Sequence, residues 1–248
     1  KIVLAEPPTK NFVFGTHHKT GTFFFTIFQR HLLTQFNAGS GRPQGDSTKF
    51  QASCRCEPAR KGIQMCLDCH VNQQIAHEVL DPKNSVRFIH SVRSPIQALV
   101  SQRGYQTRLR KVNPDRKLYD LVKADSEFYH AVDSGDETRI WYATFKTMRR
   151  DLDDMLAVMN KTEGASNVLH LNFDTVMDDV SSRVQPILNH LFEPHKEPPH
   201  ENRTAHRIKA WTPQLVESLS RKQAVHVQAS EEKKNWMKDL SHLVATSP

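Results

Sequence analysis

One stretch constrains the fold of this chain more than any other: a buried strand that runs through a short polar loop straight into an apolar helix. Residues 11–16 have the apolar character and length of a strand, and residues 23–36 place apolar side chains at helical spacing. The loop between them contains Lys19-Thr20-Gly21-Thr22. Backbone N–H groups at a helix N-terminus bind phosphate or sulfate well, so the sequence predicts an anion-binding loop here.

The order of residues in this loop narrows the choice of anion. Loops that bind nucleoside triphosphates carry their lysine directly after the second glycine of Gly-x-x-x-x-Gly-Lys-Ser/Thr. Here Lys19 stands two residues before Gly21, so the loop does not fit that pattern. Gly21 allows the backbone to approach an anion closely, and Lys19 adds a positive charge. A nucleotide kinase or another triphosphate-dependent enzyme is therefore kept only as an alternative hypothesis.

The composition fits one mid-sized globular domain over residues 1–248. The chain is 38% hydrophobic and 25% charged, and no apolar run approaches the roughly 18 residues that cross a bilayer. Its net charge of +7 suits nucleic acid, acidic membranes or a polyanionic small molecule. Because the basic residues are scattered and not interleaved with aromatic ones, we expect no nucleic-acid partner. No signal peptide precedes Lys1, and we expect that a leader or anchor has been removed.

A second anion motif follows a strand predicted at 86–91. Arg93-Ser94-Pro95 ends that strand, a helix begins near the proline, and Ser101 lies on the helix eight residues after Arg93. A guanidinium binds phosphate through two parallel hydrogen bonds, and a serine one or two turns into the helix reaches the same oxygens. Both motifs thus lie at the carboxyl ends of predicted strands, the edge where open parallel sheets bind ligands.

The rest of the chain continues as alternating strands and helices. Further strands are predicted at 62–67 and 167–171. Helices are predicted at 71–80, 117–131 and 137–161, with one more that ends near residue 192.

Together, the two motifs resemble the 5′-phosphosulfate loop and the 3′-phosphate motif of sulfotransferases that use 3′-phosphoadenosine-5′-phosphosulfate (PAPS). The resemblance implies an α/β fold, with a P-loop-like central parallel sheet flanked by helices, in a single domain. It also implies transfer of a sulfuryl group from PAPS to an acceptor hydroxyl, or less often an amine, which leaves 3′,5′-adenosine bisphosphate. The implied cofactor contacts are Lys19, Thr20, Gly21, Thr22, Arg93 and Ser101. No metal is expected, because lysine and arginine supply the positive charge.

The resemblance also implies a catalytic base, which acts beside the catalytic Lys19. Cytosolic members place a histidine at the end of the second strand, and His70 stands at the corresponding position, 23 residues before Arg93. An imidazole with an ordinary pKa of about 6.5 accepts a proton at neutral pH. Golgi members often use a glutamate, so the nearby carboxylates Asp68, Glu57 and Glu78 stay open as alternative bases. His17 and His18, beside the anion loop, are further candidates for contact with the transferring group.

Four cysteines lie close together in the sequence and leave three interpretations open. They are Cys54, Cys56, Cys66 and Cys69. A structural zinc site is one interpretation, and haem attachment is another, because the second pair and His70 match the C-x-x-C-H signature. Disulfide bonds in an oxidising compartment are the third and favoured one. The glycosylation sequons at Asn160 and Asn202 fit it, so we expect a disulfide-bonded glycoprotein of the Golgi lumen or secretory route rather than the cytoplasm.

The carboxyl-terminal part departs from the resemblance. Cytosolic members close over the 3′-phosphate with Arg-Lys-Gly, whereas this chain has Arg221-Lys222-Gln223 and lacks the glycine. No motif identifies the acceptor, so a small molecule and a glycan both stay candidates. A hypothesis from a different class is a non-catalytic zinc or redox module built on the cysteine cluster.

Overall fold

The structure of the chain is a computed structural model. It describes residues 11–37, 55–58, 64–112, 123–192, 212–217, 219–220 and 231–246. The chain folds into two compact units, the first drawn from Lys1–Val92 and Asp154–Val227, the second from Arg93–Asp153 and Gln228–Pro248. The single domain expected over residues 1–248 stays a prediction.

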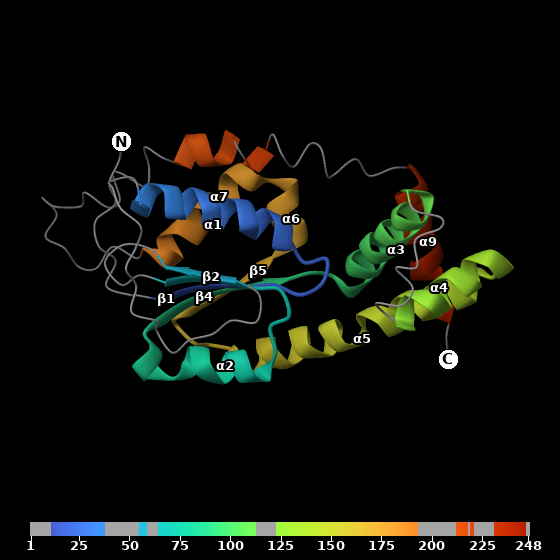
Figure 1. The fold of residues 1–248 in the computed structure, drawn as a ribbon, viewed down its shortest axis with the longest axis horizontal. Coiled ribbons are helices and arrows are strands. Elements are labelled where there is room, and N and C mark those ends of the chain that lie inside the picture. Colours follow the sequence, from blue (N-terminus) through green and yellow to red (C-terminus); the bar gives the residue numbers. More distant parts are fainter. Residues whose placement is uncertain are drawn as a thin grey trace, which may run out of the picture. The chain divides into compact units, whose positions relative to one another are not determined.

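A five-stranded sheet forms the centre of the first unit, in the order β2-β3-β1-β4-β5 (Figure 1). Four strands run parallel: β1 (Asn11–Gly15), β3 (Gln64–Asp68), β4 (Val86–Val92) and β5 (Val168–Asn172). At one edge, β2 (Arg55–Pro58) pairs antiparallel with β3. The α/β fold with a central parallel sheet flanked by helices, expected from the sequence, is confirmed.

The antiparallel strand β2 was not expected from the sequence. Its four residues, Arg-Cys-Glu-Pro, show no alternation of apolar and polar side chains that would predict a strand. Proline is compatible with a strand only at a sheet edge or a bulge, and an edge is where β2 lies. The other four strands begin and end within two residues of the positions expected for them.

Helices cover both faces of this sheet (Figure 1). On one face lie α1 (Thr22–Asn37), α6 (Phe173–Asp178) and α7 (Val180–Leu191). On the other lie α2 (Gln73–Leu80) and the carboxyl-terminal end of α5 (Glu137–Thr162). A short 3-10 helix, Pro82–Asn84, leads from α2 into β4. Burying both faces explains why β1 is almost continuously apolar.

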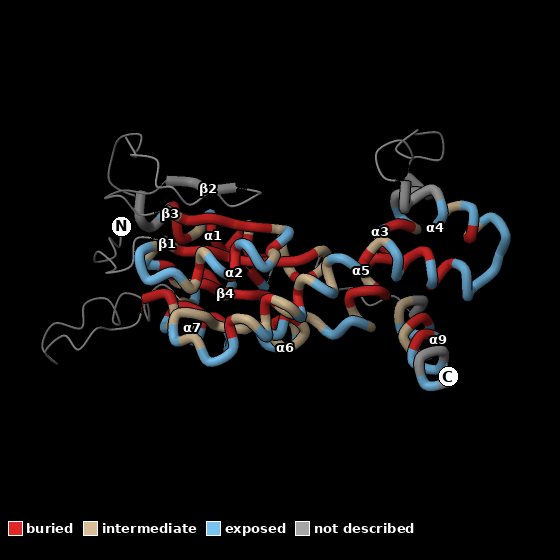
Figure 2. The backbone as a smooth tube through the Cα atoms, turned by 90° about the horizontal axis from the view of Figure 1, so that it is seen from below, coloured by how far each residue is buried: buried red, intermediate tan, exposed pale blue. Residues whose placement is uncertain are grey.

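The alternation of side chains along β1 divides the core into two layers. Figure 2 shows that β1 and β4 are buried along most of their length. Phe12 and Phe14 join the layer beneath α1 and α7, together with Phe24, Phe25, Phe28, Leu32, Ile187 and Leu188. Val13 points to the opposite layer, which contains Val71, Ile75, Val79, Phe88 and Val158. Five phenylalanines in the two layers are completely buried: Phe12, Phe14, Phe25, Phe28 and Phe88. Each fully buried phenylalanine stabilises the fold by about 1.5–3 kcal/mol relative to its exposed form, so these side chains hold β1 in place.

The second unit is helical. It contains α3 (Pro95–Val112), α4 (Lys123–Ser134), the first part of α5, and α9 (Glu231–Thr246). The sequence predicts the second of these helices at 117–131, whereas α4 begins at Lys123 and ends at Ser134. Arg103 of α3 lies buried in its core, with its guanidinium 4.5 Å from the ring centres of both Trp141 and Trp236. The same guanidinium makes two hydrogen bonds to the Glu137 carboxylate, of 2.7 and 2.9 Å. This cation therefore ties α3, α5 and α9 together.

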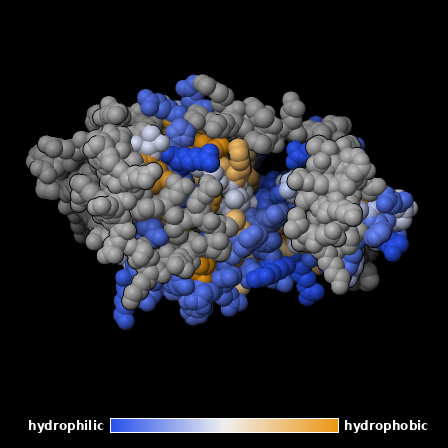
Figure 3. All heavy atoms as spheres, in the orientation of Figure 1, coloured by the Kyte–Doolittle hydropathy of each residue, from blue (hydrophilic) through white to orange (hydrophobic). Residues whose placement is uncertain are grey.

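Figure 3 shows the hydropathy of the described residues on one face of the molecule. On the face shown in Figure 3, strongly hydrophilic residues dominate and apolar ones form only small groups. Within the described part of the chain, no helix combines the length and the apolar character needed to span a membrane.

Candidate anion-binding site

The loop between β1 and α1 is a tight turn closed by Thr20. The Thr20 N–H and hydroxyl both donate to the His17 carbonyl, at 3.1 and 2.9 Å, and the His17 N–H donates to the Thr20 hydroxyl oxygen at 2.7 Å. Lys19 lies inside this turn with a φ of 63°, a left-handed conformation that costs a lysine about 1 kcal/mol. Backbone strain of this kind concentrates at functional sites.

Two neighbouring strands anchor the loop. At the end of β3, the Asp68 carbonyl accepts hydrogen bonds from the Thr16 N–H and hydroxyl, at 2.7 and 3.1 Å. The Thr16 hydroxyl also meets the hydroxyl of Thr22 at 2.9 Å, which joins the start of the loop to the start of α1. On the other side, Ser91 of β4 donates its hydroxyl to the Thr20 carbonyl. The loop is thus fixed at the carboxyl end of β1, between β3 and β4.

The path of the chain makes this edge of the sheet a natural ligand site. α1 follows β1 on one face, and α2 follows β3 on the opposite face, so the helices that follow neighbouring strands diverge beside β1. In open α/β sheets, ligands bind at such a point, outside the carboxyl ends of the strands. The N-terminus of α1 lies at this edge of the sheet. The backbone hydrogen bonds of the helix begin with the one from the Phe25 N–H to the Gly21 carbonyl, 3.0 Å.

Gly21 lets the loop pack closely against α6. Its φ is 102°, and a Cβ at this position would lie 2.5 Å from two ring carbons of Phe173. Lys19, Gly21 and Thr22 are half-buried, whereas Thr20 is buried and its N–H and hydroxyl are engaged within the turn. The four loop residues expected to contact the cofactor therefore come together, with Thr20 shaping the loop. Their contact with a phosphate stays a prediction.

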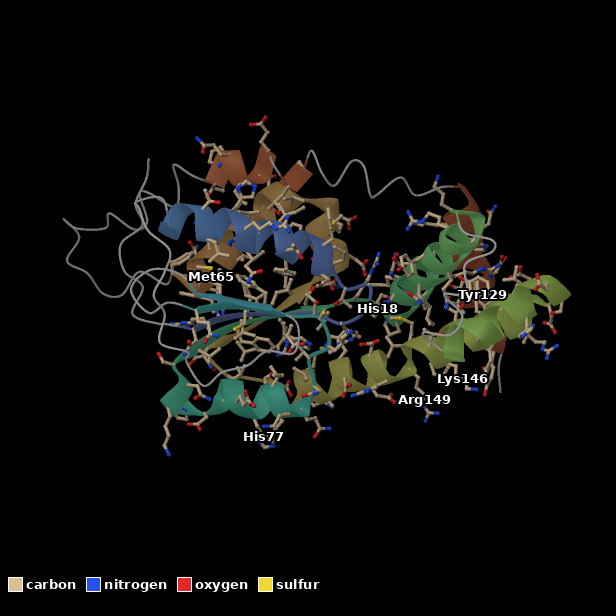
Figure 4. All side chains as sticks on the ribbon, in the orientation of Figure 1. His18, Met65, His77, Tyr129, Lys146 and Arg149 are labelled. Atoms are coloured by element: carbon tan, nitrogen blue, oxygen red, sulfur yellow. The ribbon has the colours of Figure 1, made fainter. Side chains whose placement is uncertain are left out.

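The expected base, His70, lies just after β3 and borders the loop. Its ring is exposed and parallel to that of His18, with ring centres 6.1 Å apart and an interplanar angle of 11° (His18 is labelled in Figure 4). Its N–H donates to the Asp68 side chain at 2.9 Å, so the buried Asp68 carboxylate orients this turn. Glu78 lies on α2 and accepts a bond from Gln74. The side chain of Glu57 is outside the described residues.

A chain of three histidines runs beneath the loop, and the sequence analysis missed two of them. His17 Nε2 lies 2.8 Å from His90 Nε2 on β4, and His90 Nδ1 lies 3.0 Å from His170 Nδ1 on β5. His17 is 1% exposed and His90 is fully buried, so His17 faces the protein interior. Strand register brings them together, because Gly15 pairs with His90 and His90 with His170. No local sequence pattern could reveal this register.

Burial keeps the middle histidine of this chain neutral. Desolvation lowers the pKa of His90 well below its usual value, and the neighbouring His17 and His170 lower it further. Desolvation also lowers the pKa of His170, against the opposing effects of the Glu163 carboxylate and of a hydrogen bond that the imidazole donates to the Thr162 backbone carbonyl. Burial therefore favours the neutral forms of His90 and His170.

The second expected anion motif belongs to the second unit. Arg93 directly follows β4 and is half-buried, and Ser101 lies half-buried on α3. Burial lowers the pKa of Lys233 on α9, and the positive charges of Arg108 and then Arg93 lower it further. These three cations thus form a basic cluster, although neither Arg108 nor Lys233 was assigned to the site from the sequence. Arg221, Lys222 and Gln223 lie outside the described residues.

The cysteines and sequons bear on the other hypotheses. Cys66 and Cys69 each take part in a disulfide bond. Among the described residues, no group of three or more histidine, cysteine or acidic side chains is arranged to hold a metal ion. Asn160 lies exposed on α5, whereas Thr162 of the same sequon is buried. Glycosylation and the secretory location stay predictions, and Asn202 lies outside the described residues.

Comparison with known proteins gives a likeness in structure but none in sequence. No protein-family model matches the chain, and no curated protein matches its sequence. A crystal structure of mouse sulfotransferase SULT7A1 in complex with PAP resembles this one with a TM-score of 0.40 and 13% sequence identity. The alignment covers 83% of this chain and 66% of that one. The chain thus spans just under two thirds of the length of that relative.

Proposed function

We propose that this protein is a PAPS-dependent sulfotransferase that moves a sulfuryl group to an acceptor hydroxyl. The observation that carries the proposal is the loop of residues 16–22, which joins the carboxyl end of a central strand to the N-terminus of a sixteen-residue helix. This loop combines a strained lysine, a glycine with positive φ and the open N–H groups of a helix start. The order of lysine before glycine separates it from loops that bind nucleoside triphosphates.

The loop residues fit the phosphosulfate end of the donor. The first-turn N–H groups of α1 would hold the 5′-phosphate, and Gly21 with its positive φ allows the backbone turn that leads into this helix. Lys19 would neutralise the charge that grows on the bridging oxygen as the sulfur–oxygen bond breaks. In the second unit, Arg93 and Ser101 would bind the 3′-phosphate, within the basic cluster that contains Lys233.

The transfer balances with one proton acceptor. The acceptor oxygen forms a bond to sulfur, the bond from sulfur to the bridging oxygen breaks, and its electron pair stays on the 5′-phosphate. His70 would take the proton of the hydroxyl, because its exposed ring borders the loop and the bare nitrogen of a neutral imidazole can act as a general base. Sulfuryl transfer should resemble loose phosphoryl transfer, in which positioning and charge stabilisation dominate.

The disulfide bonds of Cys66 and Cys69 support a place in an oxidising compartment. We therefore propose the Golgi lumen or the secretory route, with a small molecule or a glycan as acceptor. A screen of sulfate transfer from labelled PAPS to a panel of small alcohols, amines and glycans would identify the class.

Ligand binding tests the proposal without knowledge of the acceptor. Adenosine 3′,5′-bisphosphate should raise the melting temperature, and ATP with magnesium should not, because a ligand stabilises the native state it binds. Lys19→Asn removes the charge while keeping a residue that tolerates positive φ, and it should weaken bisphosphate binding at least tenfold, about 1.4 kcal/mol. The matched control is Lys83→Ala, an exposed lysine of the 3-10 helix, which should bind normally. Stabilisation by ATP–magnesium alone would favour a kinase, and no response to either nucleotide would refute the proposal.

A further inference from the structure

The histidine chain beneath the loop ends in a threonine whose hydrogen bonds have only one possible direction. The Thr162 hydroxyl donates its single proton to the Val158 carbonyl, 2.7 Å away within α5. The His170 Nε2 lies 3.2 Å from the same hydroxyl oxygen. Because the carbonyl can only accept, the hydroxyl proton is committed, and His170 must donate its Nε2–H to the threonine oxygen.

The direction of donation at Thr162 fixes the direction of the other hydrogen bonds in the histidine chain. A neutral imidazole carries one N–H and one bare nitrogen, so His170 with its proton on Nε2 accepts at Nδ1. His90 must then donate from Nδ1 and accept at Nε2, and His17 must donate from Nε2 to His90. The last nitrogen, Nδ1 of His17, is thereby the acceptor end of the chain, at the start of the anion-binding loop.

We propose that Thr162, His170 and His90 are positioning residues that fix the tautomer of His17 and through it hold the anion-binding loop in its turn. The backbone of His17 forms both sides of that turn, because its N–H and its carbonyl bond to Thr20. A fixed His17 ring, donating to β4, therefore orients the residues on either side of Lys19. As a contribution to sulfuryl transfer, this role rests on the proposed function.

The surroundings of the chain favour its neutral form. His90 is flanked by β1 and β5, which contribute His17 and His170, and its ring stacks on Phe88, with ring centres 5.7 Å apart. From α7, His190 Nε2 contacts the Phe88 carbonyl, and from α2, His77 contacts Lys161. The acidic side chain that acts on His170 is Glu163, directly after Thr162. A neutral chain is the condition under which one direction of donors follows.

Nitrogen-15 NMR of the histidine rings tests the tautomers directly, with no ligand present. At pH 7.5 the wild-type protein should show protons on Nε2 of His17, Nδ1 of His90 and Nε2 of His170. In Thr162→Val the hydroxyl oxygen is gone while the backbone carbonyl of residue 162 remains, so the preference for one direction should weaken and the second tautomer of each ring should become populated. Thr162→Ser, which keeps the hydroxyl, should restore the wild-type pattern. A wild-type His17 with its proton on Nδ1, or a Thr162→Val protein with unchanged tautomers, would overturn the inference.

A matched variant separates this role from loss of a helical threonine. Thr144 is also buried on α5 and donates to the Ile140 carbonyl at 2.9 Å. Thr144→Val should leave the loop amide signals and binding of adenosine 3′,5′-bisphosphate unchanged, whereas Thr162→Val should shift the His17 and Thr20 amides and weaken binding roughly three- to tenfold, the value of about one hydrogen bond. Equal effects of the two variants on the loop amides would overturn the inference. If the wild type binds no bisphosphate, the proposed function fails, and the ring tautomers and loop amides still decide the positioning role.

Discussion

Replacing Gly21 with alanine tests the geometry of the anion-binding loop most directly. Two penalties add at this position. A side chain at a φ of 102° is strained by about 1–3 kcal/mol. The new Cβ would lie 2.5 Å from the Phe173 ring, against about 3.5–4 Å for a relaxed carbon contact, so the ring must move by about 1 Å. Overpacking of this kind costs about 1–3 kcal/mol.

We therefore expect Gly21→Ala to lose about 2–6 kcal/mol of unfolding free energy, measured as a lower urea midpoint at constant slope. Gly164→Ala is the control within the same unit, because Gly164 has a φ of 72° and nothing within 4 Å of its Cβ position. It should lose only the conformational part, about 1–2 kcal/mol.

A double-mutant cycle assigns the difference to one contact. In a Phe173→Leu background the smaller side chain leaves room for the new methyl group, so Gly21→Ala should cost at least about 1 kcal/mol less there. The reasoning is refuted if Gly21→Ala destabilises no more than Gly164→Ala, or if its cost is the same in both backgrounds. Bisphosphate binding by Gly21→Ala should also fall, because the loop must shift to relieve the clash.

Two further predictions concern the buried cations and imidazoles. Burial and the adjacent imidazoles hold the pKa of His90 below its value in the unfolded chain, so the native state binds fewer protons than the unfolded state at acidic pH. The free energy of unfolding should therefore be insensitive to His90 above about pH 6.5 and should fall by up to about 1.4 kcal/mol per pH unit below it. Denaturation of His90→Gln between pH 7.5 and 5 should show a shallower slope, and an identical slope contradicts this. Arg103→Lys, which loses the paired bonds to Glu137 and the stacking on two tryptophans, should destabilise by about 1–3 kcal/mol in tryptophan-monitored unfolding. The exposed Arg149→Lys should change stability by less than about 0.5 kcal/mol, and an equal loss in both variants would exclude a special role for Arg103.

Local pattern was enough to find the element that carries the site. The apolar run before Lys19 and the helical spacing after it predicted β1 and α1 to within one residue. In both elements, the spacing of apolar residues within the segment itself shows which side is buried. The same holds for α5, whose expected bounds of 137–161 differ from the structure by one residue. The spacing of apolar residues predicts a helix or strand well where the pattern within that segment is enough to identify its buried side.

Features that depend on lateral pairing were out of reach. The histidine chain needs the register of β1, β4 and β5, which places His90 beside both Gly15 and His170 although more than seventy residues separate each pair in sequence. The basic cluster likewise brings together Arg93 and Lys233, which come from the two separate sequence segments of the second unit. The edge strand β2 owes its pairing to β3 rather than to its own composition. In each case a partner distant in the chain supplies the information.

The left-handed backbone at Lys19 has a consequence for directed evolution. Asparagine adopts positive φ more readily than lysine, so a library screened only for survival after heating should enrich asparagine at position 19. A library screened for turnover should retain lysine. If the two screens select different residues at position 19, this loop is a site where stability is lower than it could be because activity requires lysine.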